Sequence, residues 1–138
     1  MPKNKIPTTL DEAVGQLMAQ MTEADKRTYR KGPEDDAGAL LHHGPGTAMR
    51  NAWGLWHGKT ALSKWLRSKR IWHGDDASCT IYRALWRRLH GLPIDDAWLA
   101  EQAASYEKFW RQSGLTWDMQ PIAGHEEPKS RTIFVKRT

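Results

Sequence analysis

The sequence DDASCTIYRALWRRLHG, residues 75–91, decides the fold because its apolar residues recur every three or four positions. On a helix these residues share one face, while three arginines fall outside it. We expect Asp75 or Asp76 to cap the N-terminus of this helix and Gly91 to end it. The helix then needs an apolar partner surface for the shared face, which comprises Cys79, Tyr82, Leu85, Trp86 and Leu89.

Helix signals also precede this stretch. The sequence Thr9-Leu-Asp-Glu12 has the pattern of a capping box, and Thr22 to Asp25 looks like a second cap. The acidic run after Pro33 predicts another short helix, because carboxylates complement the positive end of the helix dipole. Thr47 is expected to cap the helix that follows the glycine-rich turn at residues 42–47. These signals predict several short helices before residue 60.

The chain continues in the same way up to Gly114. Residues 60–70 place apolar side chains on one helical face and basic ones on the other. Asp95 or Asp96 starts a last long helix, which Gly114 closes. No segment in this range alternates with the two-residue period of a half-buried strand. We therefore predict an all-α fold, a single compact bundle-like domain of four to six helices.

The length of 138 residues fits one domain with one hydrophobic core, to which eight Trp offer a large apolar area. We assign residues 1–114 to the helical domain. Residues 115–138 lose helical periodicity and gain Pro, Gly and charge, so we assign them to an extended tail that either packs or stays mobile. Within this tail, residues 132–135 have strand propensity but no sequence-local partner strand.

Cys79 is the only cysteine, which excludes an internal disulfide and a thiolate-rich zinc site within one chain. Its place on an apolar helix face argues against a nucleophilic role. The six histidines show no His-x-x-x-His spacing, so we expect no metal site and no cofactor. The polar N-terminal sequence and the lack of a long apolar run predict a cytoplasmic protein without membrane contact.

The net charge of +5 is concentrated in the middle of the chain. Residues 50–90 hold nine Lys or Arg against two Asp, a local charge of +7. Such a region is typical of proteins that bind an anionic macromolecule, either nucleic acid or an acidic protein surface, and a solvated surface is the alternative. No known nucleic-acid recognition motif accompanies it. The candidate contact residues are Lys64, Arg67, Arg70, Arg83, Arg87 and Arg88.

A second constellation surrounds the glycine-rich turn. Glycines beside a helix start can expose backbone donors to an anion, and Arg50 would add a guanidinium. In the alternative, structural interpretation, Arg50 and Asn51 tie loops together while Trp53 and Trp56 fill the core. We weigh the structural interpretation first. If the segment forms a cleft instead, the candidate catalytic or small-anion-binding residues are His43, Arg50, Asn51, His73 and Asp75.

Several spaced motifs occur here in order: His-x-Gly-x-Gly, Arg-Asn-x-Trp-Gly-Leu-Trp, His-x-Asp-Asp and a closing helix with Tyr and Trp. From the first capping box through Trp110, the chain resembles an uncharacterised family of small bacterial and phage-encoded helical domains. It departs from that family at Gly74, where Pro is usual, and in its tail. The matching residues are His43, Gly44, Gly46, Arg50, Asn51, Trp53, Gly54, Leu55, Trp56, His73, Asp75, Asp76, Tyr106 and Trp110.

The sequence thus leaves two functional hypotheses from different classes, beside a third in which the protein is a structural domain whose motif only maintains the fold. The first is a non-enzymatic binding module that contacts an anionic partner through its basic helices. The resemblance implies, as one form of this, an accessory or inhibitor protein of a phage or mobile element. The second is an enzyme or small-anion binder, which requires the residues of the central motif to converge in one cleft.

Overall fold

The computed structural model describes residues 5–40 and 44–124. These residues form seven helices and no strand, which confirms the all-α class, with seven helices rather than four to six. The helices are α1 (Leu10–Gln20), α2 (Glu23–Lys31), α3 (Glu34–Leu40), α4 (Pro45–Ala52), α5 (Ala61–Ser68), α6 (Gly74–Leu89) and α7 (Asp96–Arg111).

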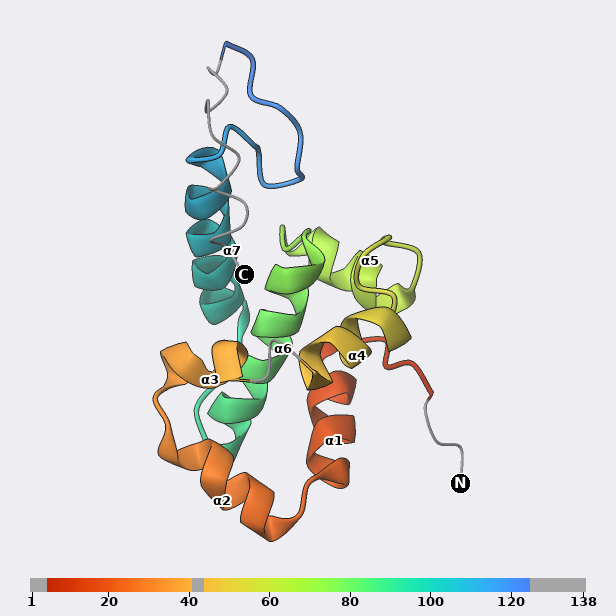
Figure 1. The fold of residues 1–138 in the computed structure, drawn as a ribbon, viewed down its shortest axis with the longest axis vertical. Helices are drawn as coiled ribbons and strands as arrows, with labels where there is room; N and C mark the ends of the chain where they lie inside the picture. The colour runs from red at the N-terminus through yellow and green to blue at the C-terminus, as the bar shows by residue number, and fades with distance from the viewer. Residues whose placement is uncertain (1–4, 41–43, 125–138) are drawn as a thin grey trace.

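Helix α6 forms the centre of the domain, with α1, α2, α3 and α4 packed around it (Figure 1). Its buried stripe is wider than the predicted face and is centred on Ile81 and Leu85, whereas Cys79, Trp86 and Leu89 are only partly buried. Close approach of α3 explains the position of Cys79, because a Cβ atom on Gly38 would lie 2.5 Å from the Cys79 Sγ. The predicted central helix is therefore present, but neighbours cover it on several sides.

The N-terminal helices begin where the capping patterns predict, with one change in detail. The Thr9 hydroxyl accepts a hydrogen bond from the Glu12 N–H, but the Glu12 carboxylate accepts from Thr8 instead of Thr9. At α2 the capping box between Thr22 and Asp25 is complete. Local hydrogen bonding thus starts both helices before any tertiary contact is needed.

Two other helix starts differ from the predictions. Helix α6 begins at Gly74, and its cap is His73, whose Nδ1 accepts a hydrogen bond from the Asp75 N–H at 3.0 Å. Neither Asp75 nor Asp76 caps it. Helix α4 begins at Pro45, so Thr47 lies inside its first turn rather than at the cap.

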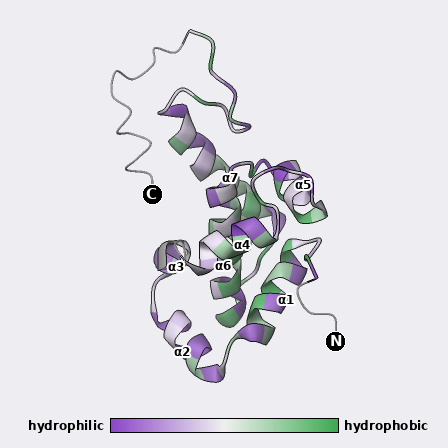
Figure 2. Ribbon diagram, turned by 45° about the vertical axis from the view of Figure 1, so that its right-hand side comes forward, coloured by the Kyte–Doolittle hydropathy of each residue, from purple (hydrophilic) through white to green (hydrophobic). Residues whose placement is uncertain are grey.

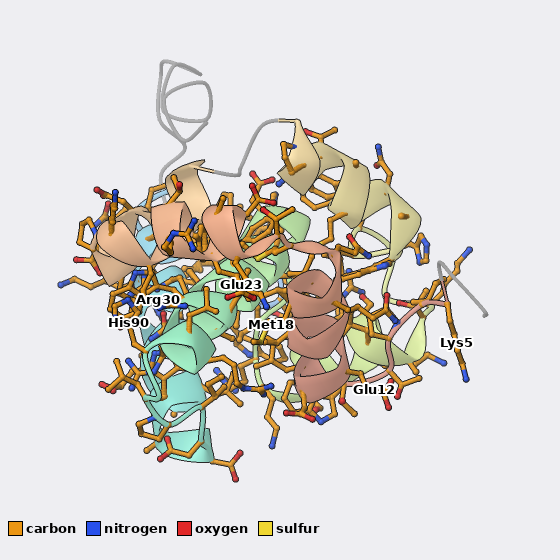
Figure 3. All side chains as sticks on the ribbon, turned by 90° about the horizontal axis from the view of Figure 1, so that it is seen from below. Lys5, Glu12, Met18, Glu23, Arg30 and His90 are labelled. Carbon is orange, nitrogen blue, oxygen red and sulfur yellow. The ribbon has the colours of Figure 1, made fainter. Side chains whose placement is uncertain are left out.

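Helix α2 is strongly polar, as its mainly purple ribbon in Figure 2 shows, and a few long side chains hold it to α6. The buried Tyr29 hydroxyl donates to the Tyr82 carbonyl at 2.6 Å, and burial raises the Tyr29 pKa. The Trp86 indole N–H donates to the Gly32 carbonyl at 2.8 Å. In Figure 3, Arg30 and His90 lie close together, and the Arg30 carbonyl is 3.0 Å from the His90 Nε2.

Helix α5 ends in a Schellman motif. The Ile71 N–H donates to the Leu66 carbonyl and the Arg70 N–H to the Arg67 carbonyl, both at 3.0 Å. Such a motif requires the left-handed backbone conformation and usually has Gly there. Here Arg70 adopts it, with φ +67°. The helix therefore ends with a strained, non-glycine residue.

The tryptophans contribute less to the core than the sequence indicates. Trp53, Trp98 and Trp110 are buried, whereas Trp56 is 46% exposed. Aliphatic side chains fill the centre instead, because they interdigitate between short helices without a polar atom to satisfy. The fully buried ones include Leu55, Leu62, Leu66, Ile71, Ile81 and Leu85.

The chain after α7 folds back on the domain over the part of the tail that the structure describes. Leu115 and Pro121 form an isolated antiparallel bridge, and the Ile122 N–H donates to the Gly114 carbonyl at 3.0 Å. The Trp117 ring meets the Trp72 ring edge to face, with centroids 5.6 Å apart. Residues 115–119 are therefore partly buried and touch the domain through Trp117, residues 120–124 are mostly exposed, and the strand-prone residues 132–135 lie outside the described part.

Within the described ranges, no helix has both the length and the apolar character that crossing a lipid bilayer requires.

Candidate functional site

Arg50 joins α4 to the start of α6. Its side chain is almost fully buried, at 6% exposure. The Nη1 donates to the Ser78 hydroxyl at 3.0 Å, and the Nη2 donates to the Thr47 hydroxyl at 3.1 Å. Its Nε lies 3.6 Å from the Asp75 carboxylate. These contacts neutralise the guanidinium and bind two helices together, as a buried cation requires.

His73 lies at the same helix start, between two indole rings. It stacks on Trp110 with centroids 4.8 Å apart and meets the edge of Trp56 at 5.3 Å. Because its Nδ1 accepts the Asp75 N–H, that nitrogen carries no proton. His73 thus serves as a helix cap covered by aromatic rings.

Asp76 and Trp110 continue this network toward α7. The Asp76 side chain is 2% exposed and accepts the Trp110 indole N–H at 2.7 Å. Beside it, the Thr80 and Tyr106 hydroxyls are 3.0 Å apart, and burial raises the Tyr106 pKa well above its ordinary value. Tyr106 therefore stays protonated. Helix α7 completes the surroundings of the central motif.

The structure brings together only part of the predicted cleft. Arg50, His73 and Asp75 converge at the start of α6, whereas Asn51 is exposed on α4. His43 lies outside the described residues. Trp56, which the structural interpretation places in the core, instead lies at the surface. The contacts support a structural role for Arg50 but not for its exposed neighbour Asn51.

The three predicted arginines of α6 are engaged with acidic side chains. Arg87 donates to the Glu34 carboxylate at 2.9 Å, and Arg83 donates to Asp35 at 3.1 Å. Arg88 is paired with Asp11. Sequence reasoning missed these carboxylates because it assigned the acidic run of α3 to the helix dipole. The α6 arginines tie α1 and α3 to the central helix.

The three predicted cations of α5 and its C-terminus have different surroundings. Lys64 is exposed, and within the described residues neither Lys64 nor Arg67 has a carboxylate within 4.0 Å. The Arg67 guanidinium lies over the Trp72 ring at 4.0 Å, and burial lowers the Arg67 pKa. Arg70 is half exposed, with Glu107 3.6 Å away. Positive charge therefore persists here.

Two of these cations lie over tryptophan rings, and a third tryptophan, Trp56, is linked to Arg67 through its backbone carbonyl. The Arg67 Nη2 donates to the Trp56 carbonyl at 3.1 Å. The Arg70 guanidinium lies over the Trp117 ring at 4.5 Å. A Cβ atom on Gly58 would lie 2.1 Å from the Arg67 Nη1, so Gly58 makes room for that side chain. We call this surface the α5 face, and define it as Trp56, Lys64, Arg67, Arg70, Trp72 and Trp117.

A separate apolar groove of about 510 Å³ runs between α1, α2, α6 and the start of α4. None of the predicted site residues lines it. Among residues 5–40 and 44–124, no three His, Cys, Asp or Glu side chains are grouped as a metal site requires. The residues that line the groove are Leu17, Gln20, Met21, Asp25, Thr28, Tyr29, Pro45, Tyr82 and Leu85.

Residues 6–89 match the model of a family described as a domain of unknown function, DUF6794. No curated protein and no solved structure matches the chain. The family match ends with the last residue of α6, short of the Trp110 limit that the sequence indicates. Helix α7, which covers His73 and Asp76, lies beyond the match. Because the match covers more than half of the chain and includes α1 to α6, the protein belongs to the DUF6794 family.

Proposed function

We propose that this domain is a non-enzymatic binding module that contacts an anionic partner through the α5 face. The observation that carries the proposal is Arg67, a partly buried guanidinium with no carboxylate within 4.0 Å among the described residues. Desolvation makes an uncompensated cation costly, and an approaching anion would relieve that cost. Arg67 remains charged because the pKa of arginine is too high for deprotonation near neutral pH.

The neighbouring cations extend this positive surface. Lys64 precedes Arg67 by one turn of α5, and Arg70 follows at the end of the helix. Lys64 is exposed and Arg70 is half exposed, so both can reach a partner without breaking the core. Among the described residues, binding through Arg70 would compete only with Glu107 at 3.6 Å, whereas binding through Arg83 or Arg87 would compete with the closer Glu34 and Asp35. We therefore assign the contact to the α5 cations.

The buried network around Arg50 does not favour the alternative of an enzyme or small-anion binder. Arg50 is already bound to Thr47, Ser78 and Asp75. His73 uses its Nδ1 as a helix cap. These contacts hold α4, α6 and α7 together behind the α5 face, and we propose that they provide its rigid support.

A small module of this kind suits an accessory or inhibitor protein of a phage or mobile element, which would act on a larger anionic partner. The resemblance to small bacterial and phage-encoded helical domains supports this role. A chain whose one cysteine is not in a disulfide also suits the reducing cytoplasm, where we place its action.

Heparin-affinity chromatography tests the proposal, since heparin offers closely spaced anionic groups. The double variant Lys64→Glu/Arg70→Glu should elute from the column at markedly lower salt than the parent. The control Arg27→Glu/Lys31→Glu makes the same change in net charge on α2, which lies at the bottom of the molecule, away from α5 (Figures 1 and 2). Equal shifts for the two double variants would mean that only net charge matters, and the proposed face would be wrong.

A further inference from the structure

We infer that the anionic partner is a single-stranded nucleic acid, whose bases stack on Trp56 while its phosphates contact Lys64, Arg67 and Arg70. This inference rests on the proposed function and names the partner of the same face. Binding of single strands combines cationic side chains that follow the backbone with aromatic side chains on which bases stack. The α5 face contains both kinds of side chain.

Trp56 is an exposed ring that the scaffold holds in place. Its six-membered ring packs on Gly74, since a Cβ atom there would lie 2.5 Å from the Trp56 Cε3. The His73 ring meets it at 5.3 Å, and the Arg50 guanidinium lies 5.7 Å from its centroid. Because α4 and α6 fix these neighbours, the ring needs little ordering when a base binds.

Cations and rings follow one another from Trp56 along the face. Arg67 donates to the backbone carbonyl of Trp56, which fixes the two residues as neighbours, and it stacks on Trp72, whose ring meets the edge of Trp117. Arg70 then lies over Trp117. Guanidinium planes also stack on bases and bind phosphates, so this order suits a strand whose bases and phosphates alternate in contact.

Trp56 is what favours a single strand over a duplex. In a double helix the faces of the bases are covered by their neighbours, whereas unpaired bases can turn outward and stack on a protein ring. A duplex or an acidic protein would meet the cations of the α5 face but would make no use of the Trp56 ring face. Preference for unpaired bases is therefore the property that distinguishes this inference from the proposed function.

Backbone strain at Arg70 points to the same surface. Arginine occupies the left-handed position that usually has Gly, and glycine would end the helix there without the cost of that conformation. Strained residues of this kind cluster at binding sites, where contact between the side chain and a ligand offsets the strain. With arginine at this position, a guanidinium lies over the Trp117 ring, a contact that glycine could not make.

Fluorescence anisotropy with three probes tests the inference. The probes are a labelled thymidine strand of about 12 nucleotides, the matching duplex, and heparin as a competitor without bases. We expect the parent protein to bind the single strand at least roughly 10-fold more tightly than the duplex at equal salt. Trp56→Ala should weaken single-strand binding by about 10-fold or more and leave the inhibition constant of heparin within about twofold of the parent value. Trp56→Phe should restore most of the affinity for the single strand.

The control is Leu92→Ala, which shortens another exposed apolar side chain and should bind like the parent. If Trp56→Ala fails to fold, a comparison of Trp56→Phe with Trp56→Leu asks the same question, because leucine is apolar but has no ring face. The inference is wrong if the parent binds the single strand and the duplex equally, or if Trp56→Ala binds the single strand as tightly as the parent. In either case, binding to heparin leaves the proposed function intact. If the parent binds none of the three probes, both proposals are rejected.

Discussion

Two groups of three cations in this domain have the same formal charge, but among the described residues all three arginines of α6 meet a carboxylate, whereas on the α5 face only Arg70 does, with Glu107 3.6 Å away. The α6 arginines Arg83, Arg87 and Arg88 all meet carboxylates from α1 or α3. On the α5 face, Arg67 meets an indole ring and a carbonyl, and no carboxylate of the described residues lies within 4.0 Å of it. The first group holds helices together, and the second keeps a positive field at the surface.

This difference shows why a local count of charges overstates the surface that is free to bind. The +7 of residues 50–90 includes every α6 arginine, yet their partners Asp11, Glu34 and Asp35 lie more than 40 positions earlier in the chain. An ion pair with partly buried partners reduces the potential that a ligand experiences. Electrostatic steering should therefore come from the end of the molecule around α5.

The largest expected effect concerns Arg50, which belongs with the paired arginines because Asp75, Ser78 and Thr47 surround it. Arg50→Ala should lower the free energy of unfolding by about 3 kcal/mol or more, since it leaves buried polar partners uncompensated. For a domain of this size, the melting temperature would fall by roughly 10 °C.

Asn51→Ala is the matched neighbour for that experiment. Asn51 is exposed, so its removal should change stability by no more than about 0.5 kcal/mol. The sequence alone predicts that both substitutions are costly, and the structure separates them. Equal thermal melts for the two variants would contradict a structural role for Arg50.

A smaller effect is expected from Glu34→Ala, which removes the carboxylate shared by Arg83 and Arg87 and bonded to the Trp98 indole N–H. Stability should fall by about 2 kcal/mol, measured by urea denaturation, because these groups are only partly buried. The variant should also elute from heparin at higher salt, since Arg87 loses its carboxylate partner and Arg83 keeps only Asp35.

Glu101→Ala provides the control, because Glu101 is an exposed glutamate of α7 and its loss changes the net charge equally. If both variants shift heparin elution by the same amount, the Glu34 ion pairs do not restrain the α6 arginines. The proposed difference between the two groups of cations would then be wrong for the α6 arginines.

Local sequence patterns predicted the helices well because helix starts and apolar faces depend on residues three or four positions apart. The start of α1 after Thr9 and the capping box from Thr22 to Asp25 are examples. The cap of α6 was predicted wrongly, because aspartate is a more common N-cap residue than histidine. The helix begins at Gly74, so Asp75 and Asp76 lie inside its first turn, where their carboxylates contact Arg50 and Trp110.

The candidate site was harder to predict because it depends on contacts between distant segments. Trp56 lies at the surface with its ring against Gly74, a residue 18 positions later in the chain, where a Cβ atom would lie 2.5 Å from the Trp56 Cε3. Likewise, Arg67 and Arg87 both follow a hydrophobic residue on an amphipathic helix, and only the approach of Glu34 distinguishes them. Spacing along one helix contains no information about either contact.

The salt dependence of binding measures how many cations take part. If Lys64, Arg67 and Arg70 each neutralise one phosphate of a single strand, raising salt from about 50 to 200 mM should weaken binding roughly 20-fold. If the three α6 arginines joined them, the loss would be roughly 300-fold. Anisotropy titrations across this range decide between the two values, and the steeper dependence would contradict the division into two groups.

The smallest expected effect on stability, and the one that most sharply separates binding from folding, comes from Arg70→Gly. Glycine relieves the left-handed backbone at φ +67°, which favours the variant by about 1 kcal/mol. Against this, the substitution removes the stacking on Trp117 and a half-exposed ion pair with Glu107, each worth about 0.5 to 1 kcal/mol at such exposure. These terms nearly cancel, so the melting temperature should stay within about 2 °C of the parent. Binding should still weaken, because one cation of the α5 face is gone.

Lys69→Gly is the control: its φ of −95° suits any residue, so glycine there relieves no strain and should destabilise the domain. A large loss of stability in Arg70→Gly, with binding unchanged, would show that Arg70 is kept for the fold and would place it with the arginines of α6.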